Sequence, residues 1–148
     1  FDVTVYLPSL TELSKYSNKN MNFYIQDSSL PSQTLRLTET MHQGSERYAI
    51  INKTTDFIIL RFYDTREQVF RNTFLAWQSA IVPINVHKAL KYYPSEYQSK
   101  IGITIHETKY MLEGVVPITV GDFVLSHTAT NTLGTFHVTF KVKKCSLV

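Results

Sequence analysis

Residues 135–142 read TFHVTFKV, and apolar and polar side chains alternate without exception through this stretch. Successive side chains of an extended strand point to opposite faces, so one face collects every apolar residue and the other every polar one. The apolar set is Phe136, Val138, Phe140 and Val142; the polar set is Thr135, His137, Thr139 and Lys141. The pattern predicts a long, half-buried antiparallel strand.

Other segments along the chain show a similar β pattern. The side chains alternate or are rich in Val, Ile, Thr, Phe and Tyr, and polar residues, Gly or Pro bound each segment. The predicted strands cover residues 1–8, 21–27, 101–106 and 111–118, with Pro117 interrupting the last.

Residues 33–52 predict one long hairpin, in which apolar residues alternate before and after a polar stretch. Its tip contains His42, Gln43, Gly44 and Ser45. This tip is too polar to belong to a core. We therefore interpret the hairpin as a protruding contact arm and not as a catalytic lid.

Residues 57–63 are apolar on both faces of an extended chain. A strand of this kind is typical of the centre of a sheet with both faces covered. The sequence therefore predicts that another element covers the second face of this strand.

An amphipathic helix over about residues 66–80 is predicted next. Its apolar stripe has helical spacing and is expected to be core rather than a ligand-binding surface. Asp64 as N-cap, with Glu67 three residues later, predicts a capping box, and Pro83 is expected to end the helix. The residues expected to pack this helix on the sheet are Phe70, Phe74, Trp77 and Ile81.

Taken together, these segments predict a mainly β fold of seven or eight antiparallel strands with one flanking helix, arranged as a β-sandwich or an open barrel. The 148 residues contain no repeat and no convincing linker, so we expect a single domain over residues 1–148. The long connection over residues 84–100 has no clear period and is a candidate contact surface.

The residue types that usually form catalytic or metal-binding sites do not occur here in the spacings that such sites require. The five histidines show no metal-ligand spacing, and Cys145 has no activating pattern around it. Phosphate-binding loops and nucleophile elbows are also missing. Spacing selects no carboxylate pair, although Glu39, Glu46, Asp56 and Asp64 are candidates for meeting in space. We expect no enzyme activity, no metal and no cofactor.

The net charge and the lengths of the apolar segments argue against a nucleic-acid-binding protein and against a membrane protein. A net charge of +3 is mild, and only Lys141, Lys143 and Lys144 crowd together, so nucleic-acid binding is not indicated. No apolar run approaches the roughly 20 residues of a membrane span, and no signal-peptide pattern opens the sequence. We expect a soluble chain of cytosolic origin without membrane insertion.

The order of these segments resembles the tail-tube proteins of contractile-tailed bacteriophages over about residues 1–143. The resemblance rests on FYIQDSSLP (23–31), a protruding hairpin, FRNTFLAWQSAI (70–81), GVVPITVG (114–121) and the closing TFHVTFKV. The helix and the GVVPITVG block are its most specific parts, and their order and spacing carry more weight than either alone.

The resemblance implies a structural virion protein that forms hexameric rings stacked into the inner tail tube, the conduit for genome ejection. It implies a contractile sheath around the tube, baseplate proteins at its end, and the tape-measure protein and then phage DNA in the lumen. The arm around His42–Ser45 would contact the next ring. Such a protein assembles in the host cytoplasm and resides in the virion.

Alternatives stay open at this point. One is a baseplate tube-initiator or hub ring protein, or the tube protein of a phage-derived contractile injection system. Another is a monomeric β-sandwich binding module or a small enzyme. The net positive charge departs from family tubes, whose lumens are often acidic.

Overall fold

The computed structural model describes residues 1–16, 25–28, 30–42, 45–55, 57–65, 67–82, 92–124 and 134–148. The strands are β1 (Asp2–Val5), β2 (Ile25–Ser28), β3 (Gln33–His42), β4 (Ser45–Thr55), β5 (Ile58–Asp64), β6 (Ser99–Ile105), β7 (Thr108–Val120), β8 (Gly134–Lys141) and β9 (Lys144–Leu147). The helices are the 3₁₀ helix η1 (Thr11–Tyr16), α1 (Val69–Ile81) and α2 (Pro94–Tyr97).

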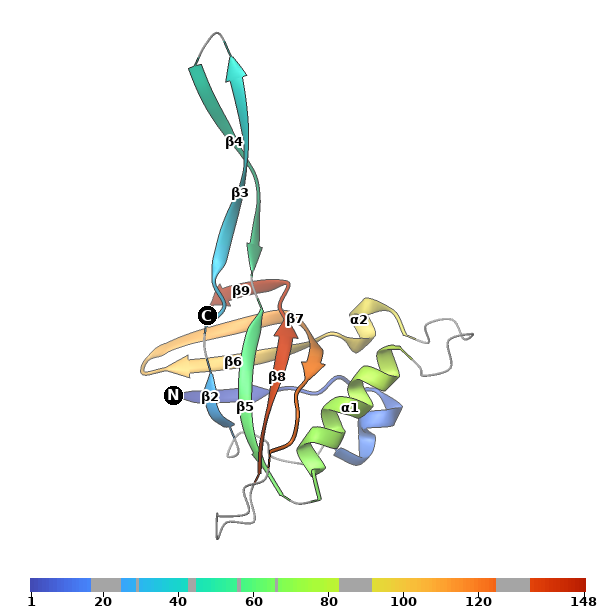
Figure 1. The fold of residues 1–148 in the computed structure, drawn as a ribbon. Helices are drawn as coiled ribbons and strands as arrows, with labels where there is room; N and C mark the ends of the chain where they lie inside the picture. Colours follow the sequence, from blue (N-terminus) through green and yellow to red (C-terminus); the bar gives the residue numbers. More distant parts are fainter. Residues whose placement is uncertain are drawn as a thin grey trace.

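Within these described ranges, seven strands form one open antiparallel sheet in the order β1-β6-β7-β8-β5-β2, with β9 also paired to β7 (Figure 1). β3 and β4 form a separate two-stranded ribbon. The predicted mainly β fold with one main flanking helix is confirmed. None of the described helices is long and apolar enough to span a membrane.

β7 joins two layers of strands that cross each other in Figure 1. Its first part pairs with β6 and β9, and its last part pairs with β8. The partner changes between Val115, which lies opposite Ser99 of β6, and Val116, which lies opposite Lys141 of β8. The register then shifts between Pro117 and Thr119. The predicted interruption at Pro117 is therefore wrong: the strand continues through a bulge, which is where a sheet tolerates proline and bends.

The core lies between these layers and beneath α1. Phe136, Val138 and Phe140 of β8 are buried, as the alternation predicts. The Phe74 ring of α1 lies 5.7 Å from that of Phe140, and the Trp77 ring lies 6.3 Å from it.

The helix stripe supplies most of this packing. Phe70, Phe74 and Trp77 are buried, and Ile81 is partly buried against the same cluster. Trp77 also donates its Nε1–H to the carbonyl oxygen of Tyr97, at 2.8 Å. This bond satisfies the polar atom of a fully buried indole and ties α1 to α2.

β5 is covered on one face only, so the prediction of two covered faces is wrong. Ile58, Leu60 and Phe62 are fully buried, whereas the side chains of Phe57 and Ile59 are 56% and 48% exposed. α1 packs on the face that carries Phe62, and the described residues place no second helix on the other face. Apolar composition alone does not distinguish a covered face from one left open.

The start of α1 also differs from the prediction. The helix begins at Val69, three residues late, and Gln68 precedes it with a left-handed φ of 53° and no side-chain cap. Asp64 nevertheless acts on the helix from the end of β5: its Oδ2 accepts a hydrogen bond from the Arg71 N–H at 2.9 Å. Its Oδ1 accepts from the Thr65 N–H at 2.8 Å. The buried carboxylate thus satisfies one of the unpaired N–H groups of the first turn.

Replacing Asp64 with Ala should lower the free energy of unfolding by about 2 kcal/mol, because two hydrogen bonds to a charged group are lost and a buried N–H is left unpaired. Urea unfolding measures this difference. The matched control is Glu67→Ala, the exposed other half of the predicted capping box. It should change stability by less than about 0.5 kcal/mol. Equal effects of the two changes would contradict the assigned role of Asp64.

Candidate assembly surfaces

The β3–β4 ribbon stands away from the body of the molecule (Figure 1). Its ladder runs from Gln33 opposite Thr55 at the base to His42 opposite Ser45 at the tip, so the ribbon extends three residues beyond the predicted hairpin. Gln43 and Gly44, the centre of the predicted contact tip, lie outside the described residues. A ten-residue strand spans about 34 Å. We call this ribbon the arm.

The base of the arm carries an apolar stripe. Leu35 and Leu37 alternate in β3, so both side chains point to one face, and each is 52% exposed. Lys53 lies opposite Leu35 in the ladder and is exposed on the same face. An isolated two-stranded ribbon is marginally stable in water, so an arm with exposed leucines is expected to gain stability from a contact.

Three strands of the sheet, β1, β2 and β9, each pair on one side only within the described part of the chain. Free strand edges carry unpaired N–H and C=O groups and invite pairing with another chain. Beside the β2 edge, the Arg61 and Asp27 side chains lie 3.8 Å apart and are both more than half exposed. Such a surface ion pair contributes little, so it does not close this edge.

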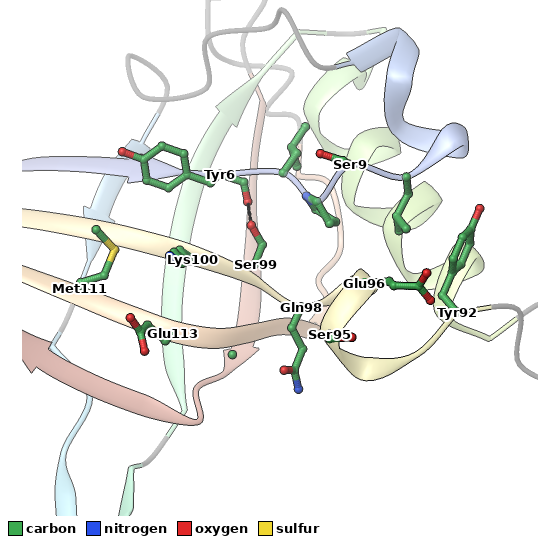
Figure 2. Close-up of a pocket in the computed structure, with 14 residues that line it drawn as sticks. Tyr6, Ser9, Tyr92, Ser95, Glu96, Gln98, Ser99, Lys100, Met111 and Glu113 are labelled. Atoms are coloured by element: carbon green, nitrogen blue, oxygen red, sulfur yellow. Dashed lines mark hydrogen bonds between the residues drawn. The ribbon is translucent and has the colours of Figure 1, made fainter.

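A groove of about 950 Å³ opens between the end of β1, α2 and the outer face of β6 and β7 (Figure 2). Alternation explains its lining: Ile101 and Leu112 turn into the core, whereas their neighbours turn outward. The lining combines apolar side chains with carboxylates and one amine. Six of its residues are Tyr6, Leu10, Lys100, Met111, Glu96 and Glu113.

Hydrogen bonds between distant segments hold the groove walls. Ser99 donates its hydroxyl to the carbonyl oxygen of Tyr6, and the Tyr6 N–H donates to the carbonyl oxygen of Lys100 at 3.1 Å. The Tyr92 hydroxyl donates to Glu12 of η1 at 2.9 Å. The candidate contact segment 84–100 therefore contributes to this groove, and its residues 84–91 lie outside the described part. Its lining residues are Tyr92, Ser95, Glu96, Gln98, Ser99 and Lys100.

The groove was missed from sequence because its walls come from opposite ends of the chain. Gly102 was an available signal: a glycine inside a strand often marks close approach of another group. The alternation of 101–106 was interpreted only as a strand.

The candidate metal-binding and catalytic residues do not lie together in the described part of the structure. Across the described residues, no three His, Cys, Asp or Glu side chains gather closely enough to bind a metal ion. His137 is exposed on β8, His106 lies in the turn between β6 and β7, and His87 and His127 lie outside the described residues. Cys145 lies in β9, a strand that sequence patterning missed, and is partly buried opposite Leu112.

The Cys145 thiol should react with iodoacetamide more slowly at pH 8 than a free cysteine does. Burial raises the pKa of Cys145, and this outweighs a hydrogen bond with Gln33 and the charge of Lys53, which lower it. A raised pKa leaves less thiolate, the reactive form, at any pH below it. The rate measured against pH should have its midpoint above the ordinary thiol pKa of about 8.5. The urea-unfolded protein should return to that ordinary value; a folded midpoint below it would refute the prediction.

Three solved structures with a similar fold come from contractile injection systems. A chain in the PVC sheath/tube terminator in the extended state has a TM-score of 0.62 and 10% identity, over 99% of this chain and 91% of that chain. A chain in the anti-feeding prophage tube-terminating cap has a TM-score of 0.62 and 12% identity, over 99% and 86%. A chain in the PVC sheath–tube complex has a TM-score of 0.57 and 13% identity, over 99% and 86%.

The sequence matches no protein-family model and no curated protein. TM-scores of 0.57–0.62 show a shared fold despite identities of only 10–13%, and the tail-tube-like fold predicted from the sequence is confirmed.

Proposed function

We propose that this chain is a structural subunit of the inner tube of a contractile tail or contractile injection system. Its copies form rings, six to a ring as the family resemblance implies, and the rings stack into a hollow conduit. The observation that carries the proposal is the open sheet, whose described edge strands β1, β2 and β9 each pair on one side only, together with a projecting arm. The fold similarity to chains of sheath–tube and terminator assemblies supports it.

The edges supply the physical reason for ring formation. A sheet with unpaired strands at both ends leaves backbone donors and acceptors for a neighbour, and closure around a ring removes every edge. Ile59 and Phe57 on the open face of β5 add apolar area that assembly would cover. The role is structural and not enzymatic.

The partners follow from this role. A contractile sheath would surround the tube and baseplate proteins would begin it. The lumen would hold a tape-measure protein and then the phage DNA or another cargo. The particle, a virion or an injection machine assembled in the host cytoplasm, is the proposed location.

A second candidate is a ring that terminates the tube. Two of the three assemblies described above are a terminator and a tube-terminating cap, and this observation favours it. A terminator forms one ring and does not extend itself, whereas a tube subunit polymerises.

Electron microscopy of the purified protein over a range of concentrations tests both candidates. Hollow tubes with regular striation support the tube role, and single rings that never stack support the terminator. Particles that remain monomers at every concentration, in the presence and absence of preformed tubes, would refute both.

A further inference from the structure

The last part of β7 is an edge of its layer. β7 pairs with β6 as far as Val115 and with β8 from Val116 onward, and no described strand pairs with the other side of residues 116–120. We call residues 116–120 the β7 edge. Residues 115–120 read VVPITV, with five β-branched side chains and no charge, and the Ile118 side chain is 49% exposed. An uncharged, β-branched strand with a free edge is prone to pair with another chain.

Helix α1 lies beside the β7 edge (Figure 1). Gln78 donates its Nε2–H groups to the carbonyl oxygen of Ile118 at 3.0 Å and to that of Pro117 at 3.4 Å. Arg71 donates its Nε–H to the carbonyl oxygen of Gly121, just past the end of the strand, at 3.0 Å. Side chains of α1 therefore occupy three backbone acceptors at the end of β7.

The spacing of the two donors matches the spacing of their acceptors. Gln78 follows Arg71 by seven residues, which is about 10 Å along a helix at about 1.5 Å per residue. Gly121 follows Ile118 by three residues, which is also about 10 Å along a strand at about 3.3 Å per residue. α1 therefore runs antiparallel to the end of β7 and covers it over this length.

Arg71 and Gln78 lie on a different stripe of α1 from the core residues. At about 100° per residue, both lie about a quarter of a turn from the stripe of Phe70, Phe74 and Trp77. The apolar stripe packs on β5 and β8, where the Phe74 ring contacts aromatic rings of both strands. The neighbouring polar stripe contacts the β7 edge, so one helix covers both a face and an edge of the same layer.

The bulge in β7 adds to this coverage. Pro117 has no N–H to donate, and the register shifts between Pro117 and Thr119. Proteins use covering helices, prolines and bulges to keep edge strands from pairing with other chains. All three occur together at the β7 edge.

We propose that Arg71 and Gln78 of α1 protect the β7 edge against strand addition by a second copy of this chain. With this edge covered, strand pairing between copies is directed to β1, β2 and β9, and α1 thereby sets the direction of assembly. The effect on assembly rests on the proposed function, whereas the protection of the edge does not.

The double variant Arg71→Ala with Gln78→Ala tests the protection. It keeps the backbone N–H of residue 71 that Asp64 accepts, so the helix start is unchanged. In native buffer, well below its unfolding midpoint, it should form thioflavin-T-positive aggregates at least tenfold faster than the wild type. Asn72→Ala with Ser79→Ala is the matched control, since these exposed positions are also seven residues apart on α1. The control should aggregate within threefold of the wild-type rate.

A rescue variant distinguishes edge protection from a loss of stability. Lysine on an edge strand opposes pairing with another chain. Ile118→Lys in the double-variant background should therefore return aggregation to within threefold of the wild-type rate, although it restores no hydrogen bond to α1. Ile59→Lys in the same background adds the same charge at a similarly exposed position on the open face of β5, and it should not rescue. Circular dichroism and thermal unfolding check each fold, and Gln78→Ala alone carries the same test if the double variant does not fold.

The outcomes separate the protection of the edge from the proposed function. Wild-type rings together with a double variant that aggregates no faster than the wild type would overturn the protection and leave the function intact. Equal rescue by Ile59→Lys and Ile118→Lys would also overturn it. A wild-type protein that never assembles would overturn the function, while fast aggregation that only Ile118→Lys reverses would still support the protection.

Discussion

Replacing Phe74 with Ala should lower the free energy of unfolding by about 3–5 kcal/mol. Phe74 is fully buried, and its ring lies 5.1 Å from that of Phe62, 6.2 Å from that of Phe136 and 5.7 Å from that of Phe140. Truncation leaves a cavity between α1 and the strands β5 and β8. The lost contacts between aromatic rings add to the free energy lost because less apolar surface is buried.

Chemical unfolding monitored by far-UV circular dichroism measures this loss. Ser79→Ala, an exposed position of the same helix, is the control and should change stability by less than about 0.5 kcal/mol. A loss below about 1 kcal/mol for Phe74→Ala would mean that α1 does not close the core. Such a loss is a large share of the total for a chain of this size, so the variant should also assemble poorly at 37 °C.

Shortening the tip of the arm should block stacking without blocking ring formation. Removal of residues 42–45, with Met41→Asn and Glu46→Gly, leaves a two-residue turn that closes the ladder at Thr40 and Arg47. The core lies outside the arm, so the unfolding midpoint of the monomer should not change by more than about 2 °C, which corresponds to less than 1 kcal/mol. Electron microscopy should show rings and a loss of tubes.

The tip variant keeps the base of the arm, including Leu35 and Leu37, so the change is confined to the tip. Tubes of normal length from the tip variant would refute the role of His42–Ser45 as an inter-ring contact. Loss of rings as well would show that the whole arm serves the ring.

Much of the fold was predictable because its patterns are local. The alternation over 135–142 and the spacing of Phe70, Phe74 and Trp77 each fix which side chains share a face. Those faces meet in the core, where the Phe62 and Phe136 rings stack at 5.4 Å. The error at the helix start arises because a distant group replaces a local one: the Asp64 carboxylate accepts from the Arg71 N–H seven residues away, and Gln68 occupies the N-cap position.

The sequence by itself determined the class of each main element and the apolar face of the helix and of the closing strand, since side-chain periodicity depends only on backbone geometry. Tertiary structure decided which apolar residues stay uncovered, as Ile59 and Leu35 show. It also decided the groove, whose walls join Tyr6 to Ser99 across 93 positions. Contacts between residues so far apart in sequence depend on how the two layers of strands cross. The local alternation of apolar and polar residues does not determine the angle or position of that crossing.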